Sequence, residues 1–279
     1  MKLIVLKGGE ERVAVPGVMR AGVPTRAPGA VAVSGCDQQW ILLNVSPSVA
    51  SQLSTDARLL RHQGLPDAAA RAVVLTDAQL DHVTGLLSLR DGAPIHLYAT
   101  PAVFEALTQQ LPVLPMLQHY CGVHWHVIPV AGECRTAVFR VDGQPHIEFT
   151  AVAVDSPLPP HAARSANPVT GDGIAIAIRD QLTGQRFFCA NQLAGLDAEA
   201  AAWMHDADCV IVGDDQPAAG PADAVPIDLL GLLAEARARR KLLLRHAGQD
   251  EHEPWHADDC LLLRQRGIEL ASDRQEIEL

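Results

Sequence analysis

Six residues, 77–82, read D-x-Q-x-D-H and gather side chains that can do chemistry. A carboxylate next to an imidazole offers one hard oxygen and one nitrogen, a mixture that suits iron, manganese or zinc. The pattern predicts a metal or ligand site around Asp81 and His82, with Asp77 and Gln79 beside them. The alternative is structural, in which Asp77 or Asp81 caps the following helix and His82 packs in the core.

The element before this segment would position it. Residues 72–75 form a continuous apolar run, which is typical of a strand that is covered on both faces. Polar residues begin directly after it. The predicted site therefore lies at the C-terminal end of a strand, where ligand sites concentrate in α/β architectures.

Short runs rich in Val, Ile and Phe recur along the whole chain between turn residues, and helical patterns are fewer. We expect one domain over residues 1–279, with two sheets enclosed by helices. A long loop is predicted over 155–173, and such loops are more often functional than structural. The predicted strands are 3–6, 30–33, 40–44, 72–75, 95–98, 124–129, 137–140, 146–154, 174–178, 186–190, 209–212 and 241–244. The predicted helices are 49–53, 102–111, 198–204, 228–240 and 257–266.

Other motifs are weaker. His124 and His126 alternate on a predicted strand, so both imidazoles share one face and either chelate a metal ion or lie on a half-exposed edge. His252 and His256 would share a helix face, or belong to a solvated acidic loop. The chain has no G-x-S-x-G or G-x-G-x-x-G motif, which argues against a serine hydrolase and a dinucleotide site. Its six cysteines show no C-x-x-C spacing, so we expect free thiols.

Composition disfavours several partners. The 279 residues include 33 acidic and 22 basic ones, a net charge of −11. Nucleic acids and anionic membrane surfaces are therefore poor candidates, because both bind through Lys and Arg. No apolar run reaches the roughly 18 residues of a transmembrane helix. The first residues lack the apolar stretch of a signal peptide, so we expect a cytoplasmic protein. An apolar edge strand would support a homodimer.

Two blocks of the sequence resemble a known family. Residues 40–47 read W-I-L-L-N-V-S-P and residues 77–90 read D-A-Q-L-D-H-V-T-G-L-L-S-L-R, at distances that match the pyrroloquinoline quinone (PQQ) biosynthesis protein B family. M-H-D-A-D-C at 204–209 and residues 266–279 are similar to that family as well. In generic metallo-β-lactamase-fold hydrolases, two histidines stand where this chain has Asp77 and Gln79, which argues against dinuclear zinc hydrolysis.

The resemblance implies an α/β fold, a metallo-β-lactamase-like αβ/βα sandwich of two mixed sheets flanked by helices. It also implies that Asp81, His82 and His246 bind a metal ion. Two histidines and one carboxylate suit Fe²⁺, with zinc as the alternative, and leave coordination positions open for O₂ and substrate. The residues that would line the substrate side and orient the ligands are Asn44, Asp77 and Gln79.

Two functions fit this resemblance. The first is oxidation or hydroxylation of a tyrosine-derived PQQ precursor at a mononuclear nonheme iron site. The second is a carrier or transport factor that binds PQQ or its precursor without catalysis. PQQ carries three carboxylates, and Arg90, Arg164 and Arg245 could each bind a carboxylate in bidentate geometry.

The chain also departs from the family. A C-x-C-x-x-C cluster is missing near the N-terminus, since residues 8–29 hold no cysteine, and we expect no structural zinc there. His246 is followed by A-G-Q-D-E-H-E-P in place of an Asn-rich segment. His161 lies in P-H-A-A-R, where the family has S-P-H-R. These changes surround the expected pocket and are compatible with a divergent paralogue.

Overall fold

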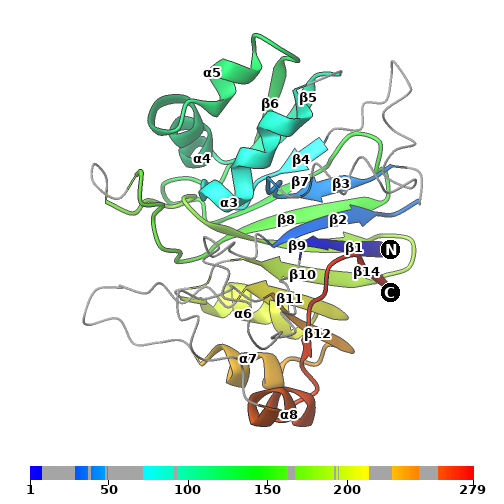
Figure 1. Cartoon of the computed structure of the whole chain (residues 1–279). Coiled ribbons are helices and arrows are strands. Elements are labelled where there is room, and N and C mark those ends of the chain that lie inside the picture. Colours follow the sequence, from blue (N-terminus) through cyan, green and yellow to red (C-terminus); the bar gives the residue numbers. More distant parts are fainter. Residues whose placement is uncertain are drawn as a thin grey trace, which may run out of the picture.

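A computed structural model shows two seven-stranded sheets stacked face to face, with helices on both outer faces (Figure 1). The predicted αβ/βα sandwich of two mixed sheets is therefore confirmed. No helix in the described part of the chain is long and apolar enough to cross a membrane. The structure describes residues 1–7, 29–36, 39–47, 49, 72–90, 93–162, 167–191, 193, 195–213, 228–244 and 257–279.

The first sheet has the strand order β14-β1-β2-β3-β4-β5-β6. Its strands from β3 to β6 are parallel, whereas β14, β1, β2 and β3 pair in antiparallel fashion. The carboxyl ends of β3, β4 and β5 therefore share one edge. The bounds are β1 Lys2–Lys7, β2 Ala30–Ser34, β3 Ile41–Leu43, β4 Ala72–Val74, β5 Ile95–Ala99, β6 Val123–Val127 and β14 Gln275–Glu278.

The second sheet has the order β13-β12-β11-β10-β9-β8-β7. Strands β7 to β10 are antiparallel and β10 to β13 are parallel. The bounds are β7 Thr136–Phe139, β8 Ile147–Ala153, β9 Ile174–Asp180, β10 Arg186–Ala190, β11 Cys209–Gly213, β12 Arg240–Leu244 and β13 Glu269–Leu270.

Helices form the two outer layers (Figure 1). One group packs on the first sheet and comprises α3 Leu80–Val83, a 3-10 helix over Thr84–Leu89, α4 Pro101–Glu105 with a π-helical turn over Ala106–Gln110, and α5 Val113–Leu117. The other group packs on the second sheet and comprises α6 Ala198–His205, α7 Leu229–Glu235 and α8 Ala257–Gln265.

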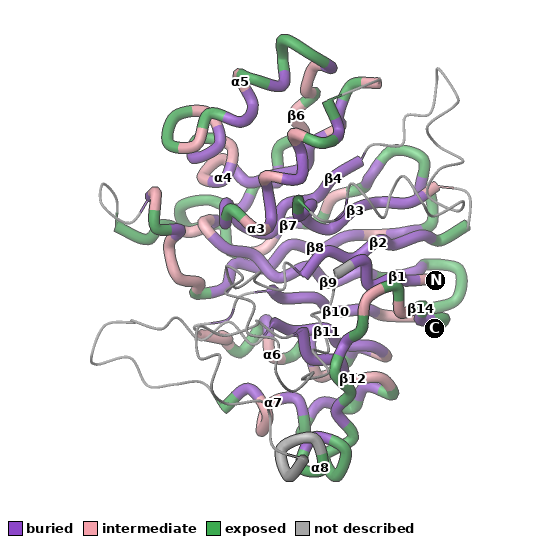
Figure 2. Tube along the Cα trace, in the orientation of Figure 1, coloured by how far each residue is buried: buried purple, intermediate pink, exposed green. Residues whose placement is uncertain are grey.

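The inner strands are buried because each sheet has a layer on both faces, whereas the edge strands β6, β13 and β14 are partly exposed (Figure 2). On β5, Leu97 packs toward the helices, while the neighbouring Tyr98 packs between the sheets. Phe149 and Ile176 extend the core between the sheets from β8 and β9. This double coverage explains why the strands read as apolar runs rather than alternating ones.

The twelve predicted strands are all present, with ends that differ by at most two residues. The sequence analysis missed the short strands β13 and β14. The prediction of one helix over 228–240 is wrong in its second half, because α7 ends at Glu235. The N–H groups of Arg239 and Arg240 instead donate to the carbonyl of Asp208, which leads the chain into β12. Most of the predicted helix 49–53 lies outside the described residues.

Gly85 allows two segments of the first sheet's edge to approach each other closely. Its N–H donates to the carbonyl of Val45 at 2.9 Å, just after β3 ends. A Cβ atom at position 85 would overlap the backbone carbonyl of Ser46 and lie 2.5 Å from the carbonyl oxygen of Val45. Backbone on both sides leaves no flexible group that can move away. This contact fixes the segment after β4 against the end of β3.

We expect Gly85→Ala to lower the free energy of unfolding by about 3 kcal/mol, because overpacking forces the backbone to shift. The measurement is urea denaturation followed by circular dichroism. Gly184→Ala is the control, since a Cβ there meets nothing within 4 Å and only the positive φ of 75° is strained. That strain costs about 1–2 kcal/mol. A loss in Gly85→Ala no larger than in the control would contradict the role of this contact.

Candidate metal centre at the end of β4

Asp77 lies at the centre of a buried hydrogen-bond network directly after β4. The residue is only 3% exposed. The carboxylate accepts hydrogen bonds from the hydroxyl of Thr76 at 2.9 Å and from the backbone N–H of Gln79 at 2.9 Å. It also contacts Nδ1 of His82, at 2.6 Å and 2.8 Å from its two oxygens.

The hydrogen bonds of this network set the charge state of Asp77 beside His82. Burial raises the pKa of Asp77, but the charge of His82 and the hydrogen bonds from His82, Gln79 and Thr76 outweigh it, so the pKa lies below its usual value. Asp77 is therefore a carboxylate, and in a neutral His82 ring the tautomer with the proton on Nδ1 is the one that can donate to it. The remaining ring nitrogen, Nε2, is then the one with a lone pair for a metal ion.

The helix-capping alternative does not hold for α3. Its N-cap residue is Gln79, which makes no side-chain capping bond, and Asp81 lies within the first turn. Asp77 binds the N–H of Gln79, one residue before the helix, and its main partner is His82. Asp81 is half-buried, so its carboxylate is not enclosed as that of Asp77 is.

Asn44 joins the ends of β3 and β4. It is fully buried and adopts a left-handed backbone conformation, with φ of 59°. Its side-chain amide donates to the hydroxyl of Thr76 at 2.8 Å, and its side-chain oxygen accepts from the N–H of Thr76 at 3.0 Å. One residue on, the N–H of Val45 donates to the carbonyl of His82 at 2.7 Å. The polypeptide around His82 is thus held from two sides.

Gln79 connects the segment to the predicted long loop. Its amide donates to the carbonyl of Pro157 at 3.0 Å, so the loop after β8 lies against the segment after β4. Four residues farther along this loop is His161. Both of its ring nitrogens are buried and have no hydrogen-bond partner among the described residues. Burial lowers the pKa of His161, which favours the neutral ring.

The structure brings together four of the predicted site residues and leaves others apart or undescribed. Asn44, Asp77, Gln79 and His82 lie in one connected network. Arg90 is exposed and donates to the carbonyl of Leu87 at 3.1 Å, at the end of the 3-10 helix. The predicted residues that lie outside the described part of the chain are Arg164, Arg245 and His246, so the third predicted metal ligand has no position here.

Within the described ranges, one group of three or more His, Cys, Asp or Glu side chains has ligand atoms close enough to share a metal ion. It is His96, His126 and Asp142. The sequence analysis considered His126 as part of an H-x-H pair but missed His96 and Asp142. The register of two parallel strands brings the two histidines together, and no local pattern reveals that register.

Comparison with known proteins places this geometry in a family. A family model described as "Beta-lactamase superfamily domain" matches residues 39–246. "Coenzyme PQQ synthesis protein B" of Pseudomonas putida (strain GB-1) is 32% identical over 94% of this chain and 90% of that protein. The chain belongs to the coenzyme PQQ synthesis protein B family. This confirms the resemblance found in the sequence.

Further similarities agree with that membership. The protein of the same name from Azoarcus sp. (strain BH72) is 39% identical over 70% of this chain, a match that spans 62% of that relative. Among solved structures, the Zn²⁺-bound PqqB from Methylobacterium extorquens covers both chains fully with a TM-score of 0.72 at 18% identity. At that identity the likeness shows the shared fold.

We expect Asp77→Ala and His82→Ala each to lower the free energy of unfolding by about 3 kcal/mol, because each leaves a buried polar group without its partner. The double variant should lose about 1–3 kcal/mol less than the sum of the two. The measurement is urea denaturation of chelator-treated protein.

The matched control is the exposed pair His205–Asp206, whose Nδ1 and Oδ1 atoms are 3.4 Å apart. The same two single variants and double variant, made at this pair, should give a coupling energy close to zero, because exposed pairs contribute little. An Asp77–His82 coupling as small as that of the control would mean that the buried contact does not stabilise the segment.

Proposed function

We propose that this chain acts in the biosynthesis of PQQ, at a mononuclear metal centre that includes Asp81 and His82. The observation that carries the proposal is the buried contact between Asp77 and His82 Nδ1. Metal-binding histidines usually donate their second ring N–H to a carboxylate, which fixes the tautomer and the ring orientation. The proposed pathway, PQQ synthesis, comes from the names of the curated relatives.

The available donors suit a borderline metal ion. His82, which offers Nε2, follows directly after Asp81, which offers a carboxylate. His246 is the proposed third ligand. His161 adds a half-buried imidazole whose two buried nitrogens have no partner in the described structure. Such unsatisfied groups are rare in folded proteins, and a bound metal ion or ligand is one way to satisfy them. Two imidazoles and a carboxylate suit iron, and zinc is the alternative.

The reaction we propose is oxidation or hydroxylation of a tyrosine-derived PQQ precursor. The chemistry that Fe²⁺ supplies when bound is activation of O₂. The protein's own groups have separate tasks. Asp77 accepts from Nδ1 of His82 and so leaves Nε2 as the nitrogen that would bind the metal ion. Gln79 holds the loop at Pro157 in place, and Arg164 and Arg245 are the proposed cations for the precursor's carboxylates.

We expect wild-type protein, purified without chelators, to hold about one iron per chain and His82→Ala to hold almost none. Asp77→Asn should bind iron about 10–100-fold more weakly, because the ring loses its orienting partner. The measurement is elemental analysis together with iron titration. His119→Ala, at an exposed histidine, is the control and should match wild type. Unchanged iron in His82→Ala would refute the proposed centre.

Two further measurements test the third metal ligand and the alternative function as a carrier. His246→Ala should lose iron as His82→Ala does, whereas His252→Ala should not. Product formation from the precursor should disappear together with the iron. Calorimetric binding of PQQ to metal-free wild type, without product formation by iron-loaded protein, would instead favour a carrier.

A further inference from the structure

Three histidines cluster at the outer edge of the first sheet, away from the centre described above. The parallel register of β5 and β6 pairs His96 with His124 and Tyr98 with His126. β6 is the last strand of that sheet. His96 is level with Ala72 at the start of β4, whereas Asp77 follows the other end of that strand. His126 is level with Tyr98 and therefore with Val74 at the end of β4, so the cluster runs along the edge of the sheet and shares no residue with the centre after β4.

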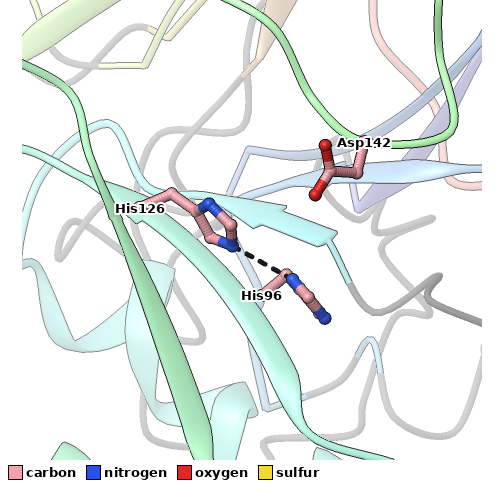
Figure 3. Close-up of side chains that lie close together, drawn as sticks. All are labelled: His96, His126 and Asp142. Atoms are coloured by element: carbon pink, nitrogen blue, oxygen red, sulfur yellow. Dashed lines mark hydrogen bonds between the residues drawn. The ribbon is translucent and has the colours of Figure 1, made fainter.

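The ring nitrogens of two of these histidines face each other (Figure 3). Nδ1 of His96 and Nε2 of His126 are 3.0 Å apart. Two nitrogens on one tetrahedral zinc ion lie roughly 3.3 Å apart, given zinc–nitrogen distances of about 2.0–2.1 Å. Asp142 supplies a carboxylate from the loop after β7, and the three ligand atoms all lie within 4.8 Å of one another. A small movement of the side chains would place all three around one ion.

We propose that His96, His126 and Asp142 form a second metal site, for a borderline divalent cation such as Zn²⁺. The site does not depend on the proposed function, because it shares no residue with the centre at Asp81 and His82.

The surroundings hold these donors in place. The ring of Tyr98 stacks on His126 with centroids 4.4 Å apart. The Tyr98 hydroxyl accepts a hydrogen bond from the N–H of Asp142 at 3.3 Å. One tyrosine therefore packs against one ligand and fixes the backbone of another. The rings of His124 and His126 also stack on His96, each at 5.2 Å.

The charge balance favours a cation over a plain hydrogen bond. Two neutral imidazoles and one carboxylate carry a single negative charge, and a divalent ion would offset it. Asp142 is exposed and both histidines are half-buried, so an ion can enter from solvent. The ligands come from both sheets, and a bound ion would link them at this edge.

The test is isothermal titration of chelator-treated full-length protein with ZnCl₂. We expect wild type to bind one more equivalent of Zn²⁺ than His126→Phe, which keeps a ring against Tyr98 but removes the nitrogen. Asp142→Asn keeps the shape of the side chain and should lower the affinity for this additional Zn²⁺ at least about tenfold, because the charged ligand is lost. Zinc should raise the melting temperature of wild type more than that of either variant.

His119→Phe makes the same exchange at an exposed histidine outside the cluster and should bind as wild type does. A crystal grown with zinc should show an anomalous scattering peak between His96 and His126. Equal stoichiometry and affinity in wild type, His126→Phe and Asp142→Asn would overturn the proposal. The two imidazoles would then form only a hydrogen bond.

Discussion

Burial of a carboxylate against an imidazole is the constraint on which the centre after β4 depends. Asp77 and His82 are 3% and 1% exposed, so neither can rely on water to stabilise its polar atoms. Removing such groups from water costs free energy that only close, well-directed contacts offset. The contacts of Asp77 with Thr76 and Gln79 fill its remaining acceptor positions. The pair can therefore persist in the core and hold one ring nitrogen of His82 in a defined direction.

That pair is positioned by the parallel half of the first sheet. β3 and β4 end side by side, and Asn44 joins their ends through Thr76. The close approach at Gly85 then presses the short helices after β4 onto the end of β3. Hydrogen bonds of the backbone and of buried side chains do this work, so the site rests on the sheet rather than on a free loop. Rigid elements of this kind hold ligands more accurately than loops do.

The edge of the same sheet presents a contrasting arrangement. His96 and His126 face each other without a buried carboxylate behind them, and Asp142 arrives from the opposite sheet. Solvent reaches this group, so its donors can exchange protons and ions freely. The centre after β4 is built around the buried contact between Asp77 and His82, whereas the edge group derives its geometry from ring stacking on Tyr98. The same fold thus orients imidazoles in two ways, by a buried carboxylate contact and by ring stacking.

The sequence by itself determined twelve of the fourteen described strands, the family and the D-x-Q-x-D-H segment, because apolar runs, turn residues and a 14-residue block are local signals. It placed Asp77 near His82 but did not show that they bond, since that requires the turn between them to close inside the core. The tertiary structure alone brought His96 to Asp142, 46 residues apart in the chain. Strand register and sheet stacking decide such contacts, and both depend on the packing of the whole sandwich rather than on any short stretch of residues.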